Sequence, residues 1–419
     1  MKTSMTMRSL AAVFAATCAA TPAFAAEGAV PHGVPHLDHV FVIMMENHGF
    51  NQVIGNPSAP FMNLYAKRVN LATNYFAVAH PSLTNYLEIV GGSNFGVLND
   101  NSPDWHDATC QTNLALGTPS LDNGTFPNIC PIQGTGTDAA TPVIDYSNET
   151  EPPAITAVTE IDGKLSIPAA PGTVGKSIAD QLVEAGKNWK SYQESLTYTG
   201  ADLVNYSDGY FDNNSDLATI LAGSGATSSN IVHLYAVKHD PFAYFQSVQE
   251  GQLNRIVGFE GARGLLDDLQ SGNIPDYSYI VPNQCDDQHG QNNATAACFE
   301  DPNDQGTLVG LNPGLIFQGD RTLRTLVKEI HDSPVWPKGR NAIVIVWDEN
   351  DYSSAPYPNR VVLTVDTNYG VHAVESDKFY THFSLLKSVE SGLALPCLNH
   401  ACDDSVHVMA DLFAPADWN

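Results

Sequence analysis

The sequence is poor in basic residues. It has 19 Lys and Arg against 46 Asp and Glu, which gives a formal net charge of -27 at pH 7. Nucleic-acid backbones are held by clusters of Lys and Arg, so this balance argues against nucleic acid as a partner. It also argues against purely electrostatic docking on anionic lipid. A bound metal ion would still provide local positive charge for an anionic substrate.

Hydrophobic runs of membrane-spanning length are also lacking. The first 25 residues carry Lys2 and Arg8, then an Ala-rich segment, then Ala23-Phe24-Ala25, which is typical of a secretory signal peptide and its cleavage site. The apolar segment at residues 10–20 is too short to cross a bilayer. We therefore expect a signal peptide at 1–25 and a secreted or periplasmic protein without a transmembrane segment.

Cysteines are few, and none are arranged as CxxC, which argues against a zinc ribbon. Cys18 lies in the predicted signal peptide, and the even number that remains indicates disulfides in an exported chain. Their clustering suggests the pairs Cys110–Cys130, Cys285–Cys298 and Cys397–Cys402. Other pairings stay open, because the sequence alone does not fix connectivity.

The chain after the signal peptide is long enough for one large α/β domain or two smaller ones. We expect a single domain over 26–419. At about 96–172 the sequence turns to Asn, Asp, Thr, Pro and Gly with few apolar runs, which predicts a loop-rich insertion. His106 lies in it, either as a surface histidine or as a substrate contact.

An apolar, mostly β-branched run ends in acids at 341–352, NAIVIVWDENDY. Its lack of alternation predicts a strand of an α/β sheet that is covered on both faces. Asp348, Glu349 and Asp351 follow at its carboxyl end, where ligands of such sheets bind. Adjacent carboxylates repel each other unless a cation lies between them, so the run predicts a metal site. An ordinary solvated junction is the alternative.

A second apolar run, at 39–45, ends in Glu46-Asn47-His48, which predicts another buried strand that delivers an acid. A helix-capping turn is the alternative. Further on, Pro81 and the apolar spacing after it predict a helix with Ser82 in its first turn. A hydroxyl there lies near free N–H groups and the positive end of the helix dipole. Capping is the commoner role for such a serine.

Candidate polar residues also follow other predicted elements. His239 comes after a strand predicted at 230–236, and Asp287 and His289 come from a loop after a strand predicted at 276–281. That loop lets both side chains reach one cation. Alternatively, His239 makes a structural hydrogen bond, and Asp287 and His289 lie in an acidic surface loop that is tied by a disulfide.

A helix predicted at 381–390, with Thr381 as its cap, places His382 at a helix start. There it either faces the predicted metal-binding side chains or is solvated in the first turn of the helix.

These motifs stand in a specific order: ENH at 46–48, HPSLTNY at 80–86, CDDQH at 285–289, WDEND at 347–351 and YTHFSLLKSVE at 380–390. Together they resemble the bacterial phosphoesterase family that includes secreted acid phosphatases and phospholipases C. The resemblance covers most of the chain and is weakest at 96–172. It implies an alkaline-phosphatase-like α/β fold, a three-layer sandwich with a mostly parallel central sheet.

The resemblance also implies residue roles. It makes Ser82 the nucleophile, and Thr84, which replaces a usual proline, is an alternative hydroxyl with poorer register to Asn85. The implied metal ligands are Glu46, Asn47, Asp348, Glu349 and Asp287. The implied substrate contacts are Asn85, His106 and His289, and the implied catalytic histidines are His239 and His382.

The expected cofactor is a divalent metal ion. Oxygen ligands favour Ca²⁺, Mg²⁺ or Mn²⁺, whereas histidines suit Zn²⁺ at a second site. The resemblance leaves one or two ions open.

We expect an acid phosphatase that hydrolyses small phosphorylated substrates, phosphate monoesters, through a phosphoseryl intermediate. A phospholipase C acting on phospholipid is the alternative. We favour the monoesterase, because the sequence up to Asn419 leaves no room for the C-terminal domains that the resemblance implies for many such phospholipases. A non-catalytic exported metal-binding protein is the second alternative.

Overall fold

The structure is a computed structural model that describes most of the chain outside the predicted signal peptide and insertion. The described residues are 27–95, 97, 100, 102–103, 129, 131–132, 174–196, 204, 232, 234–292, 294–350 and 359–413. His106, Asp351 and the predicted pair Cys110–Cys130 lie outside them.

A sheet of eight strands runs through the described part of the chain. In order across the sheet these are β5 (Ile256–Gly258), β4 (Trp189–Gln193), β6 (Tyr277–Val281), β1 (His39–Met45), β7 (Asn341–Trp347), β8 (Leu363–Thr367), β2 (Asn70–Ala72) and β9 (Glu375–Ser376). From β5 to β7 every pairing is parallel. Only β8 runs antiparallel to its neighbours β7 and β2.

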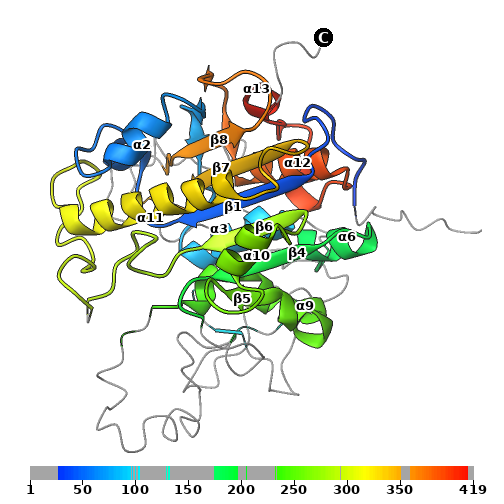
Figure 1. Ribbon diagram of the computed structural model, residues 1–419, viewed down its shortest axis with the longest axis horizontal. Helices are drawn as coiled ribbons and strands as arrows, with labels where there is room; N and C mark the ends of the chain where they lie inside the picture. The colour runs from blue at the N-terminus through cyan, green and yellow to red at the C-terminus, as the bar shows by residue number, and fades with distance from the viewer. Residues whose placement is uncertain are drawn as a thin grey trace, which may run out of the picture.

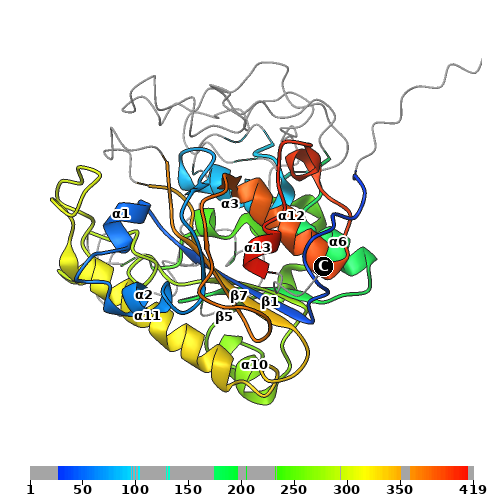
Figure 2. The same cartoon turned by 90° about the horizontal axis from the view of Figure 1, so that it is seen from above.

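Helices cover both faces of the sheet, as Figures 1 and 2 show. One face carries α2 (Pro60–Tyr65), α10 (Leu265–Ser271) and α11 (Pro313–Asp332). The other carries α3 (Ser82–Gly91), α6 (Ile178–Glu184), α12 (His382–Leu393) and α13 (Ala410–Phe413). The structure therefore confirms the predicted three-layer α/β sandwich with a mostly parallel sheet.

Shorter elements connect these layers. They are α1 (Phe50–Val53), β3 (Tyr75–Phe76), η5 (Val237–His239), η6 (Pro241–Tyr244), α9 (Gln246–Gly251), η7 (Leu253–Arg255), β10 (Tyr380–Thr381) and η8 (Asn399–Cys402). Strands β3 and β10 pair with each other in parallel, outside the main sheet.

The two apolar runs of the sequence form the centre of the sheet. Every residue of β7 is buried, and so is every residue of β1 after His39. Both strands lie between helical layers, so neither needs a polar face, which explains the absence of alternation. The strands predicted at 39–45 and at the apolar part of 341–352 are confirmed.

The strand predicted at 230–236 is wrong for the described positions, 232 and 234–236, which form no strand. His239 instead ends the 3₁₀ turn η5, in which its N–H donates to Ala236 O at 3.0 Å. Tyr235 and Ala236 are buried, but they pack against the core from a loop, because an apolar segment forms a strand only where a neighbouring strand pairs with it.

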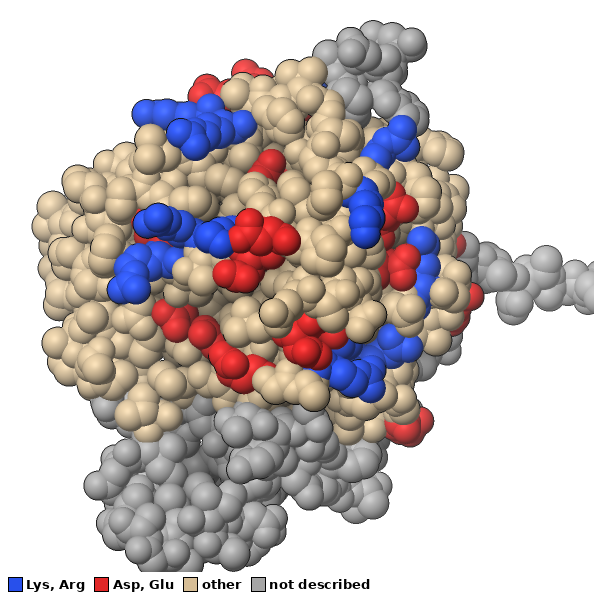
Figure 3. Space-filling view, viewed as in Figure 1, with Lys and Arg blue, Asp and Glu red and all other residues tan. Residues whose placement is uncertain are grey.

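Two predicted disulfides are present, Cys285–Cys298 and Cys397–Cys402. The first closes the loop that follows β6. Among the described helices, none combines the length and apolar character needed to cross a bilayer. Figure 3 shows Lys and Arg interspersed with Asp and Glu on the face covered by α11, so that face carries charge of both signs.

Glu390 is a buried acid within α12, and burial raises its pKa well above the ordinary value of 4.5. Its Oε1 accepts a hydrogen bond from the Leu398 N–H at 2.8 Å. The folded state therefore holds a proton that the unfolded state releases, so stability falls as pH rises from 4.5 through the raised pKa.

We expect Glu390→Gln, which keeps the Oε1 acceptor and cannot ionise, to flatten this dependence. Thermal denaturation from about pH 5 to about pH 8 should show a smaller fall in Tm for the variant than for the unmodified protein. Glu375→Gln, at an exposed position on the edge strand β9, is the control. Parallel Tm curves for Glu390→Gln and the unmodified protein would contradict the expectation.

Candidate active site

The pairing of β1 with β7 brings two acids to one edge of the sheet. Met45 lies opposite Trp347 in the parallel register, so Glu46 and Asp348 follow side by side. The Asp348 N–H donates to Met45 O at 2.9 Å, and the Asn47 N–H donates to Asp348 Oδ1 at 3.1 Å. Asn47 has φ 57°, a left-handed conformation that asparagine tolerates well, and it turns the chain back toward Asp348.

Ser82 is the first residue of α3 and is 2% exposed. Its hydroxyl lies 3.1 Å from Glu46 Oε2 and 3.3 Å from Glu349 Oε1, so it donates to carboxylates rather than capping the helix. The Thr84 hydroxyl donates to Val97 O at 3.2 Å instead. Of these two hydroxyls, Ser82 is therefore the one that faces the acids.

Asn85 holds the segment before Ser82 in place. Its Oδ1 accepts from the backbone N–H groups of Val78 and Ala79 at 3.0 Å each, and its Nδ2 donates to Ala79 O. Nδ2 also lies 2.9 Å from Glu349 Oε2. These contacts occupy both ends of a buried amide, so they favour a positioning role and not the expected substrate contact.

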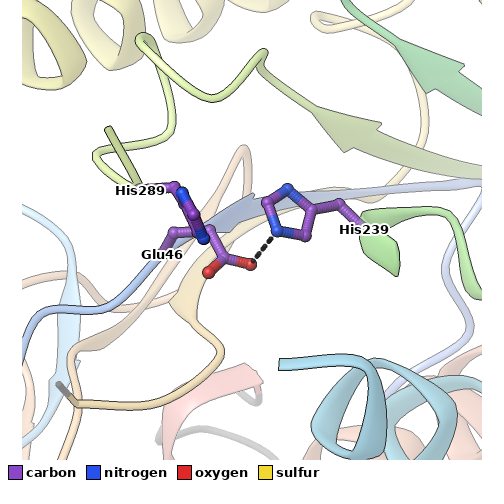
Figure 4. A group of neighbouring side chains, drawn as sticks. All are labelled: Glu46, His239 and His289. Carbon is purple, nitrogen blue, oxygen red and sulfur yellow. Dashed lines mark ion pairs between the residues drawn. The ribbon is translucent and has the colours of Figure 1, made fainter. Parts of the chain in front are cut away.

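Figure 4 shows three side chains that converge from separate segments: Glu46 after β1, His239 from η5 and His289 from the loop after β6. Each offers one potential metal-binding atom, and these atoms lie within 4.8 Å of one another. His239 Nε2 lies 3.0 Å from Glu46 Oε1, and His239 Nδ1 lies 3.1 Å from Asp287 Oδ2. The His239 ring stacks on Tyr86, which fixes its plane.

The loop that carries Asp287 is docked on the ends of β1 and β7. The Glu46 N–H donates to Asp287 O at 2.8 Å, and the Trp347 indole donates to Gln288 Oε1 at 3.0 Å. The His289 N–H donates to Asp287 Oδ1 at 2.7 Å. The loop is thus fixed by the same strands that deliver Glu46 and Asp348.

The contacts of His382 do not fit the expected catalytic role. Its Nε2 lies 2.6 Å from the Asp348 carbonyl, which can only accept, so Nε2 carries the proton. Nδ1 therefore accepts from the Tyr75 hydroxyl at 2.8 Å. Burial lowers the pKa of His382 to about 4, which keeps the ring neutral. With both nitrogens bonded inside the protein, His382 positions Asp348.

Burial dominates the electrostatics of this site. It raises the pKa of Glu46 to about 7 and raises the pKa values of Asp287 and Asp348 well above the usual range, with further contributions from neighbouring carboxylates. Burial also lowers the pKa of His289 to about 3 and the pKa of His239 well below its usual value. Acids crowded together out of water are the arrangement that a bound cation stabilises.

The side chains present fit a divalent metal ion. Among the described residues, Asp348 Oδ2 is buried without a hydrogen-bond partner. Glu46 Oε1, Asp287 Oδ2 and His239 Nε2 are buried with only the ion-pair contacts given above. Buried polar atoms are rarely left unsatisfied unless a ligand completes them. The predicted ligands Glu46, Asp348, Glu349 and Asp287 are thus brought together. Asn47 contributes a backbone N–H to Asp348, and its side chain is partly buried.

Lys238 and Asp100 were not predicted from the sequence, yet they border the same centre. Lys238 Nζ lies 3.0 Å from Asp100 Oδ2 and 3.1 Å from His289 Nε2. Burial alone would lower the pKa of Lys238, but the carboxylates of Asp100 and Glu46 raise it, so the side chain stays charged. A lysine directly before a candidate site histidine, in a chain with few basic residues, was the available signal.

The sequence matches the Phosphoesterase family over residues 56–299, which is more than half of the chain. The chain belongs to this family. The resemblance inferred from the motifs is therefore confirmed.

Similar proteins include two fungal enzymes. An acid phosphatase of Aspergillus fumigatus is 23% identical over 359 residues, which cover 85% of this chain and 55% of the relative. A phosphate-repressible acid phosphatase of Penicillium chrysogenum is 25% identical over 366 residues, 86% of this chain and 60% of the relative. The chain thus spans little more than half the length of these relatives.

A bacterial relative matches over more of its own length. The phosphatidylinositol-3-phosphatase of Mycobacterium tuberculosis is 22% identical over 383 residues, 89% of this chain and 85% of the relative. Among solved structures, a protein in the alkaline phosphatase superfamily from Vibrio parahaemolyticus aligns at 11% identity with a TM-score of 0.44, covering 88% of this chain and 70% of that one.

We expect metal ions to stabilise the protein through the buried atoms of this centre. Adding Mn²⁺ or Zn²⁺ to chelator-treated protein should raise its Tm, because an ion that binds the folded state selectively stabilises it. Asp348→Asn removes one charged ligand and should lose most of this increase. Metal content by elemental analysis should fall in parallel.

Asp301→Asn is the matched control. The Asp301 side chain is also only 6% exposed, but it bonds His48 and lies outside the cluster. If added metal raised the Tm of Asp348→Asn and of Asp301→Asn equally, the metal centre described above would be ruled out.

Proposed function

We propose that the protein is a secreted, metal-dependent phosphatase of broad specificity that hydrolyses phosphate monoesters through a phosphoseryl intermediate. One observation carries the proposal: the buried Ser82 hydroxyl lies at the N-terminus of α3, between the carboxylates of Glu46 and Glu349. Membership of the Phosphoesterase family and the similarity to two acid phosphatases support it.

The contacts of Ser82 suit a nucleophile. Its hydroxyl hydrogen bond to Glu46 Oε2 or Glu349 Oε1 gives the proton an acceptor as Oγ attacks phosphorus. The Oγ–P bond forms while the ester P–O bond breaks, and the alcohol leaves. The N–H groups and positive dipole end of α3 stabilise the phosphate that Ser82 then carries. Water then attacks phosphorus, the Oγ–P bond breaks, inorganic phosphate leaves, and Ser82 Oγ regains a proton.

Two histidines contact the acids that accept from Ser82: one is His80, whose Nδ1 lies 3.0 Å from Glu349 Oε2, and the other is His239. It contacts Glu46 Oε1, whose other oxygen accepts from Ser82, so Ser82, Glu46, His239 and Asp287 form one connected series. We assign proton transfer to the leaving alcohol or from the attacking water to His239. His382 instead holds the Asp348 carbonyl.

A divalent cation would be held by the carboxylates of Glu46, Asp348, Glu349 and Asp287, three of which have buried oxygens aimed at this centre. When bound, it would lower the pKa of the Ser82 hydroxyl and neutralise phosphate oxygens. Secretion is part of the proposal because of the predicted signal peptide at 1–25 and the disulfides, which persist in oxidising compartments.

We expect Ser82→Ala to lower kcat for p-nitrophenyl phosphate by at least about 10³-fold, because no other group would attack phosphorus. Thr84→Ala is the control, since its hydroxyl bonds Val97 O. Its activity should stay within about threefold of the unmodified protein. Mass spectrometry after rapid acid quenching should find phosphate on Ser82. Full activity in Ser82→Ala would exclude it as the nucleophile.

We further expect faster turnover of p-nitrophenyl phosphate than of p-nitrophenyl phosphorylcholine. Chelators should abolish both activities, and a fluorophosphonate should leave them unaffected, because the sequence lacks the GxSxG motif of α/β-hydrolases. Faster turnover of the diester would instead support a phospholipase C. No hydrolysis with any metal would support a metal-binding protein.

A further inference from the structure

Lys238 brings a positive charge into a site built mainly from carboxylates and neutral histidines. Its ammonium contacts Asp100 Oδ2 at 3.0 Å and His289 Nε2 at 3.1 Å. His289 donates through Nδ1 to Gly290 O, so its Nε2 is the acceptor for Lys238. The Gly290 carbonyl and the Lys238 ammonium thus contact the two ring nitrogens of His289. The Lys238 head group therefore has a defined place next to that ring.

Asp100 ties that ammonium to the nucleophile. Its Oδ2 accepts from Lys238, and its Oδ1 accepts from the Leu83 N–H at 3.1 Å. Leu83 directly follows Ser82 in the first turn of α3. A single carboxylate therefore links the Lys238 ammonium to the first turn of α3, at the residue after Ser82.

The ammonium has capacity for a further acceptor. A lysine ammonium has three N–H donors, and the described residues provide two side-chain acceptors. The Lys238 side chain is only 18% exposed, so a third acceptor for its ammonium would come mainly from a ligand in the site. A purely structural ion pair is a weak explanation, because the Asp100 side chain is 31% exposed and such pairs contribute little stability.

We propose that Lys238 binds a non-bridging phosphate oxygen and makes the site selective for the dianion of a monoester over the monoanion of a diester. The inference rests on the proposed phosphatase function. Coulomb attraction is proportional to the charge of the ligand, so one fixed ammonium favours the doubly charged substrate. A phosphate monoester is largely dianionic near pH 7, whereas a diester has a single negative charge.

The test compares two substrates with the same leaving group, p-nitrophenyl phosphate and methyl p-nitrophenyl phosphate, at about pH 7. Lys238→Met should lower kcat/KM for the monoester by about 10- to 100-fold, the effect of losing a hydrogen bond from a charged donor. The loss on the methyl diester should be only about 3- to 10-fold, because half the ligand charge gives half the Coulomb energy. The inhibition constant of inorganic phosphate should rise by about the same factor as kcat/KM for the monoester falls.

Lys238→Arg, which keeps the charge, should restore most of the monoester activity. Lys238→Gln, which keeps donors without charge, should resemble Lys238→Met and serves if the Met variant does not fold. Lys378→Met is the control, because Lys378 is an exposed lysine paired with Asp411. It should change neither rate.

Equal losses on both substrates would overturn the proposal, because they would show that Lys238 only holds Asp100 and His289 in place. Failure of the unmodified protein to hydrolyse either substrate would instead overturn the proposed function. The two failures are therefore distinguishable in one set of measurements.

Discussion

The parallel pairing of β1 with β7 is the constraint on which the site depends. Its register places Met45 opposite Trp347, so Glu46 and Asp348 reach the same edge of the sheet. A shift by one residue would turn one of these acids toward the opposite helical layer. The register is secured by the core itself, because both strands are buried between helices and their side chains pack on both sides.

Elements outside the sheet are fixed to this edge by hydrogen bonds. The loop after β6 is docked through Asp287 O and Gln288, and α3 directs Ser82 toward Glu46 and Glu349. His382, at the start of α12, holds the Asp348 carbonyl. The polar groups that fix these elements are bonded to each other, which favours a single arrangement of the side chains around the centre.

The same burial gives the site its electrostatic character. Acids that would be ionised in water have raised pKa values, and the neighbouring histidines have lowered ones. Such a centre is unfavourable for the protein alone and favourable for a cation and a phosphate together. Lys238 is a permanent positive charge beside it, in a protein whose overall charge is strongly negative.

The sequence by itself was enough to predict the layered α/β fold and the position of acids at the ends of its central strands. Unbroken apolar runs at 39–45 and 341–347 indicate doubly covered strands, and the acids after each run must then emerge at a strand end. The apolar period after Pro81 likewise placed Ser82 at the start of a helix. These features are local, so pattern and spacing were enough to find them.

Only the tertiary structure decided what each polar side chain contacts. It showed the internal hydrogen bonds of Asn85 and His382, separated the contacts of Ser82 from those of Thr84, and brought Lys238 and Asp100 to the site. It also placed His239 on a 3₁₀ turn where a strand was predicted. Hydrogen bonds between residues far apart in sequence depend on how separate elements pack, and no local pattern records that packing.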